Sequence, residues 1–177
     1  VMPEVDAVLV SVPNAEHFRV AKAALDAGKH VLLEKPATGS LSELAELYTL
    51  ADAHGVKLVI AFHAAFAADL EWYISNREKV DQGERVVVFN CGFYDPYVTD
   101  GELQPQARSL GGSWTDSGVN ALSVIVKLLP RLQVISSVFT PDPKSIASEL
   151  HATVDLEFQV ENQEDAGFGS IDTNWML

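Results

Sequence analysis

The sequence has a single cysteine, Cys91, so an internal disulfide bond is excluded. Cys91 lies in an alternating apolar run and is interpreted as a small core residue. Without disulfides, a reducing and therefore cytoplasmic compartment is expected. No Cys-x-x-Cys motif or Cys/His cluster has the spacing of a zinc site, so no metal is expected. Four histidines have no ligand-like spacing and are expected on the surface or in loops: His30, His54, His63 and His151.

Positive charge is also scarce. The 12 Lys and Arg residues stand against 25 Asp and Glu residues, a formal net charge of −13. This balance repels phosphate groups, so nucleic acid and anionic membranes are excluded as partners. No apolar run is long enough to span a bilayer, and no signal peptide precedes the first expected strand. The chain enters a strand soon after Val1 and ends at Leu177 within a strand-like run, so both ends are expected to be cut.

The first half alternates short apolar strands with amphipathic helices. Strands are predicted over residues 6–12, 31–33 and 56–62, the first of them a central strand covered on both faces. One helix follows Asn14 as its N-cap and ends at Gly28; the next begins at the capping box of Ser40 and Glu43 and ends at Gly55. This β-α-β-α-β order predicts a parallel sheet with right-handed crossovers, the C-terminal part of a Rossmann-like sheet. A further helix is expected over 69–81.

From residue 84 the pattern changes to strands of alternating polarity. Residues 85–93 form a strand whose Val87, Phe89, Cys91 and Phe93 share one face. A polar loop over 95–114 leads to a helix over 116–129. Further strands are expected over 133–139, 152–160 and 167–174. One helix beside several strands predicts an α+β domain with a mostly antiparallel sheet, so the chain divides into residues 1–82 and 83–177.

Lys35 is the first candidate for chemistry, because it follows the second strand, and open α/β sheets bind ligands beyond the carboxyl ends of their strands. Pro36 restricts Lys35 to extended geometry. A lysine held there is able to donate to a substrate oxygen and, if desolvated, to exchange a proton. The alternative is a surface lysine paired with Glu34.

Two further groups of polar residues begin helices. Asp116 and Asn120 are four apart and lie on one helix face, where a carboxylate and an amide bracket a polyhydroxylated ligand. The alternative is that Asp116 only caps the helix. Asn14 and His17 flank the start of the first helix, where a polar part of a cofactor would bind. The alternative there is an N-cap with a surface histidine.

These motifs together resemble the Gfo/Idh/MocA (glucose–fructose oxidoreductase-like) family. The pattern V-x-V-P-N-x-x-H over Val10–His17 is followed by A-G-K-H-V-L-L-E-K-P over Ala27–Pro36, and G-G-S-W-x-D-x-G-V-N over Gly111–Asn120 is similar to the family's second motif. The resemblance covers most of the chain up to Leu129. Beyond that residue it is only architectural.

The resemblance implies a role for each matching position. Lys35 becomes the catalytic lysine, which takes the hydroxyl proton as hydride leaves the same carbon, and Asp116 contacts substrate and lysine. The family usually has histidine as the acid/base group where this sequence has Asn120, which does not titrate but is able to bind a sugar hydroxyl. Trp114, with Tyr94 and Tyr97, is a candidate to stack on a sugar face, or else ordinary packing.

The resemblance also implies a nicotinamide cofactor, NAD or NADP. Its contacts in this stretch are expected to fall on a set at two strand ends: Pro13, Asn14, His17, Glu34 and Lys35. The family's glycine-rich fingerprint is missing from the sequence, and its Arg-Phe pair is replaced by Ala65-Phe66. The expected function is therefore hydride transfer between NAD(P) and a sugar or polyol, of the aldose or inositol type. The resemblance also implies a homo-oligomer that associates through the second-domain sheet. The alternatives are a non-catalytic sugar sensor on the same fold, or an inactive fragment.

Overall fold

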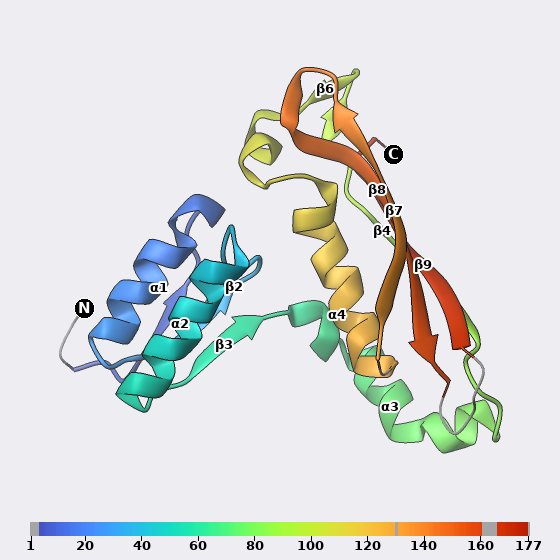
Figure 1. Cartoon of the computed structure of the whole chain (residues 1–177), viewed down its shortest axis with the longest axis horizontal. Coiled ribbons are helices and arrows are strands. Elements are labelled where there is room, and N and C mark those ends of the chain that lie inside the picture. Colours follow the sequence, from blue (N-terminus) through green and yellow to red (C-terminus); the bar gives the residue numbers. More distant parts are fainter. Residues whose placement is uncertain (1–3, 130, 161–165, 177) are drawn as a thin grey trace. The chain divides into compact units, whose positions relative to one another are not determined.

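The computed structural model describes residues 4–129, 131–160 and 166–176. The chain forms two compact units, Val1–Phe62 and His63–Leu177, and each is described by itself. The first unit is drawn in blue to cyan and the second in green to red (Figure 1).

The first unit is a three-stranded parallel sheet with two helices. Strands β1 (Ala7–Val10), β2 (His30–Glu34) and β3 (Leu58–Ala61) lie in the order β1-β2-β3. Helix α1 (His17–Asp26) and helix α2 (Leu41–His54) connect them. Leu25, Leu33 and Leu47 are fully buried where the helices meet the sheet. The β-α-β-α-β order and the parallel sheet predicted from the sequence are confirmed.

Helix ends follow the predicted capping residues with one exception. The Ser40 side chain accepts a hydrogen bond from the Glu43 backbone N–H, and Gly55 closes α2 in the left-handed conformation at φ 64°. The prediction that Asn14 is the N-cap of α1 is wrong. Asn14 begins a 3₁₀ turn, η1 (Asn14–Glu16), and α1 starts only at His17, with no side-chain cap at Glu16.

One face of this sheet is apolar and exposed. Leu9 pairs with Leu32, and Leu32 pairs with Val59, so the three side chains form a row across the strands. All three side chains are exposed, Leu9 to 64%. The expectation that the first strand is covered on both faces is therefore wrong. Successive right-handed crossovers along β1-β2-β3 place α1 and α2 on the same side, because strand order follows chain order.

The second unit begins earlier than the domain boundary expected after residue 82. A 3₁₀ turn, η2 (His63–Phe66), and helix α3 (Ala68–Asp81) belong to it. The Lys127 ammonium explains this grouping, because it donates to the Ala65 carbonyl at 2.5 Å and forms an ion pair with Glu71. The helix expected over 69–81 is confirmed. Its sequence joins it to the first half, but its contacts tie it to the second.

A mixed four-stranded sheet forms the body of the second unit, in the order β4-β9-β8-β7. Its strands are β4 (Val88–Tyr94), β7 (Gln133–Asp142), β8 (Ser145–Gln159) and β9 (Ala166–Asn174). The β7–β8 and β8–β9 pairs are antiparallel, whereas β4 and β9 run parallel. The expected α+β architecture is confirmed, although β7 and β8 extend toward each other into one long hairpin.

Helix α4 (Val119–Leu128) packs on one face of this sheet (Figure 1). The core there combines Ile125 of α4 with Val154, Leu156 and Phe158 of β8. Phe89, Cys91 and Phe93 of β4 pack against it, as their alternation predicted. Val87 does not join them, because it precedes the strand and is half exposed.

The polar segment between β4 and α4 contains short elements of its own. Strands β5 (Val98–Thr99) and β6 (Glu102–Leu103) form a two-residue ladder, and a 3₁₀ turn, η3 (Pro105–Ser109), follows. Leu103 and Ala107 pack with the fully buried Trp175 in a small separate core. The segment is thereby fixed against the end of β9.

Candidate functional site

Lys35 follows the last residue of β2, Glu34, and lies at the carboxyl edge of the parallel sheet. The loop after β1, which holds Pro13 and Asn14, leaves the same edge, because β1 and β2 are parallel neighbours. This is the edge at which open α/β sheets bind ligands. The structure therefore brings together the strand ends that carry four of the predicted cofactor residues. The Lys35–Pro36 peptide bond is cis.

His17, the fifth predicted cofactor residue, is 1% exposed. Its ring Nδ1 lies 2.7 Å from the Pro36 carbonyl oxygen, and its Nε2 lies 2.9 Å from the Val12 carbonyl oxygen. The alternative of a surface histidine is wrong, because the first residue of α1 points into the space between the two strand-end loops.

Asp116 and Asn120 lie in the first helical turns that lead into α4. A π-helical turn, η4 (Trp114–Gly118), precedes α4, and the Asp116 backbone N–H donates to the Gly112 carbonyl at 3.0 Å. Asp116 is 7% exposed and Asn120 is 4% exposed. Neither start of the helix has a side-chain cap, so the alternative that Asp116 is only a cap is not borne out.

The Asn120 side chain is only partly satisfied. Its Nδ2 donates to the Asp116 backbone carbonyl at 3.4 Å, a long contact. Its Oδ1 is buried and accepts no hydrogen bond from any residue that the structure describes. A buried amide oxygen without a donor is costly, and substrate hydroxyls are donors of the kind it lacks.

Hydrogen bonds from distant parts of the second unit hold the η4 turn in place. The Trp175 indole N–H donates to Ser117 Oγ at 3.0 Å, and the Ser117 hydroxyl donates to Asp95 at 2.5 Å. Thr173 donates to Ser113 Oγ at 3.1 Å. Sequence reasoning missed these partners, which lie far from Ser117 along the chain, and no local pattern links them.

The second glycine of the Gly111-Gly112 pair is explained by Glu149. The Glu149 carboxylate accepts from the Trp114 backbone N–H at 2.8 Å. A Cβ on Gly112 would lie 2.1 Å from that carboxylate, and Gly112 has φ +113°. Only glycine therefore fits at this position.

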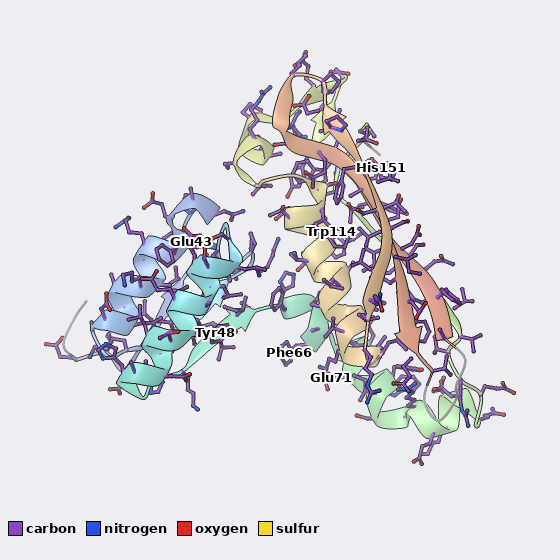
Figure 2. All side chains as sticks on the ribbon, in the orientation of Figure 1. Glu43, Tyr48, Phe66, Glu71, Trp114 and His151 are labelled. Carbon is purple, nitrogen blue, oxygen red and sulfur yellow. The ribbon has the colours of Figure 1, made fainter. Side chains whose placement is uncertain are left out.

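The aromatic residues proposed to stack on a sugar have different packing partners. Trp114 begins the η4 turn that leads into α4 (Figure 2), where a Cβ on Gly118 would touch its ring at 2.4 Å, and it packs against the core. The rings of Tyr97 and Trp175 meet edge to face, with their centroids 5.0 Å apart. Burial, followed by the charges of Asp116 and Asp95, raises the pKa of the Tyr97 hydroxyl. Tyr94 is exposed on the opposite sheet face beside Asp172.

Ala65 and Phe66 occupy the positions at which the family has an Arg-Phe pair. Both contact the ammonium group of Lys127. Lys127 of α4 lies 4.6 Å above the Phe66 ring, in addition to its contacts with Ala65 and Glu71. The side chains of Phe66 and Glu71 lie near the lower end of α4 in Figure 2.

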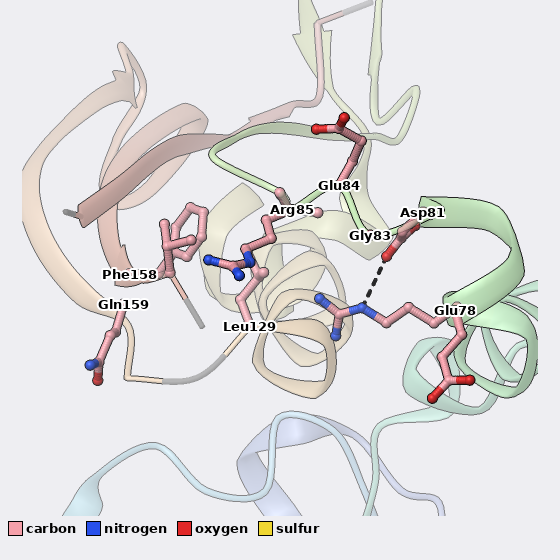
Figure 3. Close-up of a pocket in the computed structure, with 11 residues that line it drawn as sticks. Glu78, Asp81, Gly83, Glu84, Arg85, Leu129, Phe158 and Gln159 are labelled. Carbon is pink, nitrogen blue, oxygen red and sulfur yellow. Dashed lines mark hydrogen bonds and ion pairs between the residues drawn. The ribbon is translucent and has the colours of Figure 1, made fainter. Parts of the chain in front are cut away.

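A hollow of about 270 Å³ lies in the second unit between the end of α3 and the end of β8 (Figure 3). Its floor is apolar, formed by Leu129 and Phe158, and its rim mixes Arg85 with Glu78, Asp81 and Glu84. None of the predicted site residues lines it. The mixed charges of the rim select no ligand class.

Neither a metal-binding cluster nor a membrane-spanning helix is found in the described ranges. Among these residues, no group of three or more His, Cys, Asp or Glu side chains is arranged to hold a metal ion. Within the same ranges, no helix has the length and apolar character needed to cross a bilayer.

Comparison with known proteins gives a consistent match. Residues 1–62 match the family model GFO_IDH_MocA, described as an oxidoreductase family with an NAD-binding Rossmann fold. The uncharacterized oxidoreductase YdgJ of Escherichia coli is 46% identical over 130 residues, which cover 73% of this chain and 34% of YdgJ. The scyllo-inositol 2-dehydrogenase (NADP(+)) IolU of Bacillus subtilis is 31% identical over 127 residues, covering 70% of this chain and 39% of IolU.

The fold also agrees with that of a solved structure. An inositol dehydrogenase homolog from Azotobacter vinelandii, crystallised with NADH and myo-inositol, superposes with a TM-score of 0.79 at 22% identity. The match covers 97% of this chain and 45% of that protein. The chain thus spans between about a third and a half of each of these three proteins. By its sequence and its fold, it belongs to the Gfo/Idh/MocA family of oxidoreductases, which has an NAD-binding Rossmann fold.

Proposed function

We propose that the protein is an NAD(P)-dependent oxidoreductase that transfers hydride between the nicotinamide and a hydroxyl-bearing carbon of a sugar or polyol. The observation that carries the proposal is the position of Lys35. It lies at the carboxyl edge of a parallel sheet, within the segment that matches an NAD-binding Rossmann fold. A lysine at this edge lies where an open α/β sheet binds its ligand.

The residues present fit part of such a cofactor. The loops after β1 and β2 leave one edge and present Pro13, Asn14, Glu34 and Lys35. A glycine-rich G-x-G-x-x-G loop, which cradles the pyrophosphate in this fold, is not in the sequence. These residues would therefore hold the cofactor near its nicotinamide end, and the choice between NAD and NADP lies outside them.

The chemistry divides between hydride and proton. A bound nicotinamide would supply the acceptor for the hydride that leaves the substrate carbon. Lys35, in its neutral form, takes the proton of the hydroxyl on that carbon, so that the C–O bond becomes a carbonyl. The reverse reaction returns the proton from the Lys35 ammonium to the carbonyl oxygen. Lys35 suits this role because the ammonium formed by the proton transfer donates a hydrogen bond to the new carbonyl oxygen and keeps it in place.

Asp116 and Asn120 bind the substrate in this proposal. Asp116 accepts hydrogen bonds from hydroxyl groups, and the Asn120 Oδ1 receives the donor that it otherwise lacks. Asn120 does not take up a proton at neutral pH, so Lys35 carries the proton transfer alone. The similarity to IolU and to the Azotobacter vinelandii homolog supports a polyol of the inositol type as the substrate class.

The open face of the second-unit sheet is the proposed self-association surface. It presents Val88 and Phe168, which pair across β4 and β9, and Val138, which pairs with Thr153. All three apolar side chains are about half exposed or more. A second copy covering this face would remove them from water.

The test uses the natural full-length protein, with NAD and NADP in turn and a panel of inositols and aldoses, and follows nicotinamide absorbance. Lys35→Met is expected to lower kcat by roughly 10²- to 10⁴-fold, the usual contribution of a general base. Lys57→Met is the matched control, because Lys57 is exposed at the opposite, amino end of β3.

A non-catalytic sugar sensor is the second candidate, favoured by the amide of Asn120 in place of an acid/base group. It predicts no turnover with any substrate and cofactor pair, while a polyol still raises the melting temperature. Turnover that survives Lys35→Met unchanged would contradict the assignment of Lys35.

A further inference from the structure

His17 bridges the two loops at the carboxyl edge of the first sheet. Its two ring nitrogens lie 2.7 Å from the Pro36 carbonyl oxygen and 2.9 Å from the Val12 carbonyl oxygen. Val12 belongs to the loop after β1, and Pro36 follows Lys35 in the loop after β2. A single side chain thus contacts the backbone of both loops.

The contacts on His17 leave it no capacity for a ligand. Both neighbours are carbonyl oxygens, which only accept, so each contact is a hydrogen bond when the ring nitrogen facing it carries a proton. The ring is also 1% exposed. The interactions of His17 are therefore with the protein backbone, and its predicted role as a direct cofactor contact does not follow from this geometry.

We propose that His17 is a positioning residue, which sets the place of the Lys35 loop relative to the Pro13-Asn14 loop. It acts through the Pro36 carbonyl, one residue after Lys35, and through the Val12 carbonyl, directly before Pro13. Its relevance to turnover rests on the function proposed above. The bridging itself is a property of this chain, and it is tested without cofactor or substrate.

Three substitutions separate the two contacts. His17→Asn keeps a donor near the position of Nδ1 and retains the bond to Pro36. His17→Gln keeps a donor near the position of Nε2 and retains the bond to Val12. His17→Phe keeps a ring of similar shape and removes both ring nitrogens. Because Asn and Gln differ only in length, comparing them separates the effect of each bond from a general loss of folding.

The first measurement is amide hydrogen exchange of this chain without ligands, followed by NMR. His17→Phe is expected to raise exchange at least tenfold at Lys35, Ala37 and Thr38 and at the amides of Val12 and Asn14. His17→Asn is expected to protect the Lys35 loop more than the Val12 loop, and His17→Gln the reverse. Unchanged exchange in both loops of His17→Phe, or equal exchange in the Asn and Gln variants, would overturn the proposal.

The second measurement is steady-state turnover of the natural full-length protein carrying the same substitutions. Positioning of Lys35 predicts that kcat falls in the order His17→Asn, His17→Gln, His17→Phe, with the last at least tenfold below the parent. Equal kcat in all three, with only lower melting temperatures, would assign His17 a purely structural role. If the parent itself has no turnover, the proposed function fails, and the exchange measurement still decides whether His17 bridges the loops.

Discussion

At the scale of single residues, the most informative group is the Asn120 amide. It is buried, its Nδ2 makes one long hydrogen bond, and its Oδ1 has no donor among the described residues. Proteins retain such groups where a ligand completes them, since leaving a buried acceptor unpaired costs about 1–3 kcal/mol. Stability and ligand binding therefore make opposite demands on this position.

Replacing Asn120 with the similarly shaped leucine tests that conflict. Asn120→Leu is expected to leave the free energy of unfolding unchanged or to raise it by about 1 kcal/mol, because the unpaired oxygen is removed. The same change is expected to lower kcat/KM for a polyol at least tenfold. Urea denaturation and steady-state kinetics measure the two effects.

The control for Asn120→Leu is Ser123→Ala, in the same helix. Ser123 donates to the Asn120 backbone carbonyl at 2.7 Å, so its loss should lower stability slightly without affecting substrate binding. A loss of more than about 2 kcal/mol in Asn120→Leu would mean that Oδ1 has a donor in the folded protein.

At the scale of elements, helix α2 is fixed at both of its ends by local contacts. Helix α2 begins at Ser40, whose hydroxyl accepts from the Glu43 backbone N–H at 3.3 Å, while the Glu43 carboxylate accepts from the Gly39 N–H. The helix ends at Gly55 in a left-handed conformation that glycine adopts without strain. Helix α2 in turn buries Leu47 and Ala51 against the sheet that carries Lys35.

Ser40→Ala removes the cap of α2. The expected loss is about 1 kcal/mol of unfolding free energy, because the Glu43 N–H is left without its partner. Urea denaturation of this chain measures it. The matched control is Thr49→Ala in the same helix, where the hydroxyl only donates back to the Ala45 carbonyl. That change should be neutral or slightly stabilising, since alanine has the higher helix propensity. Equal losses in both variants would argue against a cap.

At the scale of the whole molecule, the two units differ in how they expose apolar surface. The first exposes the row Leu9, Leu32 and Val59 on one sheet face. The second exposes apolar residues on the sheet face opposite α4, around a polar centre in which His151 and Thr153 contact the Asp172 carboxylate. His151 of β8 is labelled on this sheet in Figure 2.

Val138→Lys tests the open face as a self-association surface. Val138 and Val134 lie on the same strand and are similarly exposed, 66% and 60%. They face opposite sides of the sheet, because Val138 pairs with Thr153 on the open face and Val134 pairs with Leu156 on the α4 side. Val138→Lys is expected to weaken association of the full-length protein at least tenfold by burying a charge, whereas Val134→Lys should not. Sedimentation velocity measures both, and an unchanged oligomer in Val138→Lys would reject this surface.

The sequence by itself determined the features that depend on neighbouring residues. Strand and helix positions follow from periodicity, and the ends of α2 follow from Ser40 and Gly55, because caps act within one turn. The E-K-P run placed Lys35 at a strand end in the same way. These local patterns were sufficient for the fold class and the family.

Only the tertiary structure decided what depends on residues far apart in the chain. His17 gave no sign of being buried, since its partners are backbone carbonyls that have no sequence signature. The grouping of α3 with the second unit depends on Lys127. Tyr94 and Tyr97 differ in their surroundings because Tyr94 ends β4 on its exposed face, whereas Tyr97 lies beyond the strand and packs against Trp175. Long-range packing chooses among arrangements that the local pattern leaves equally favourable, and it therefore decides which of the candidate residues meet.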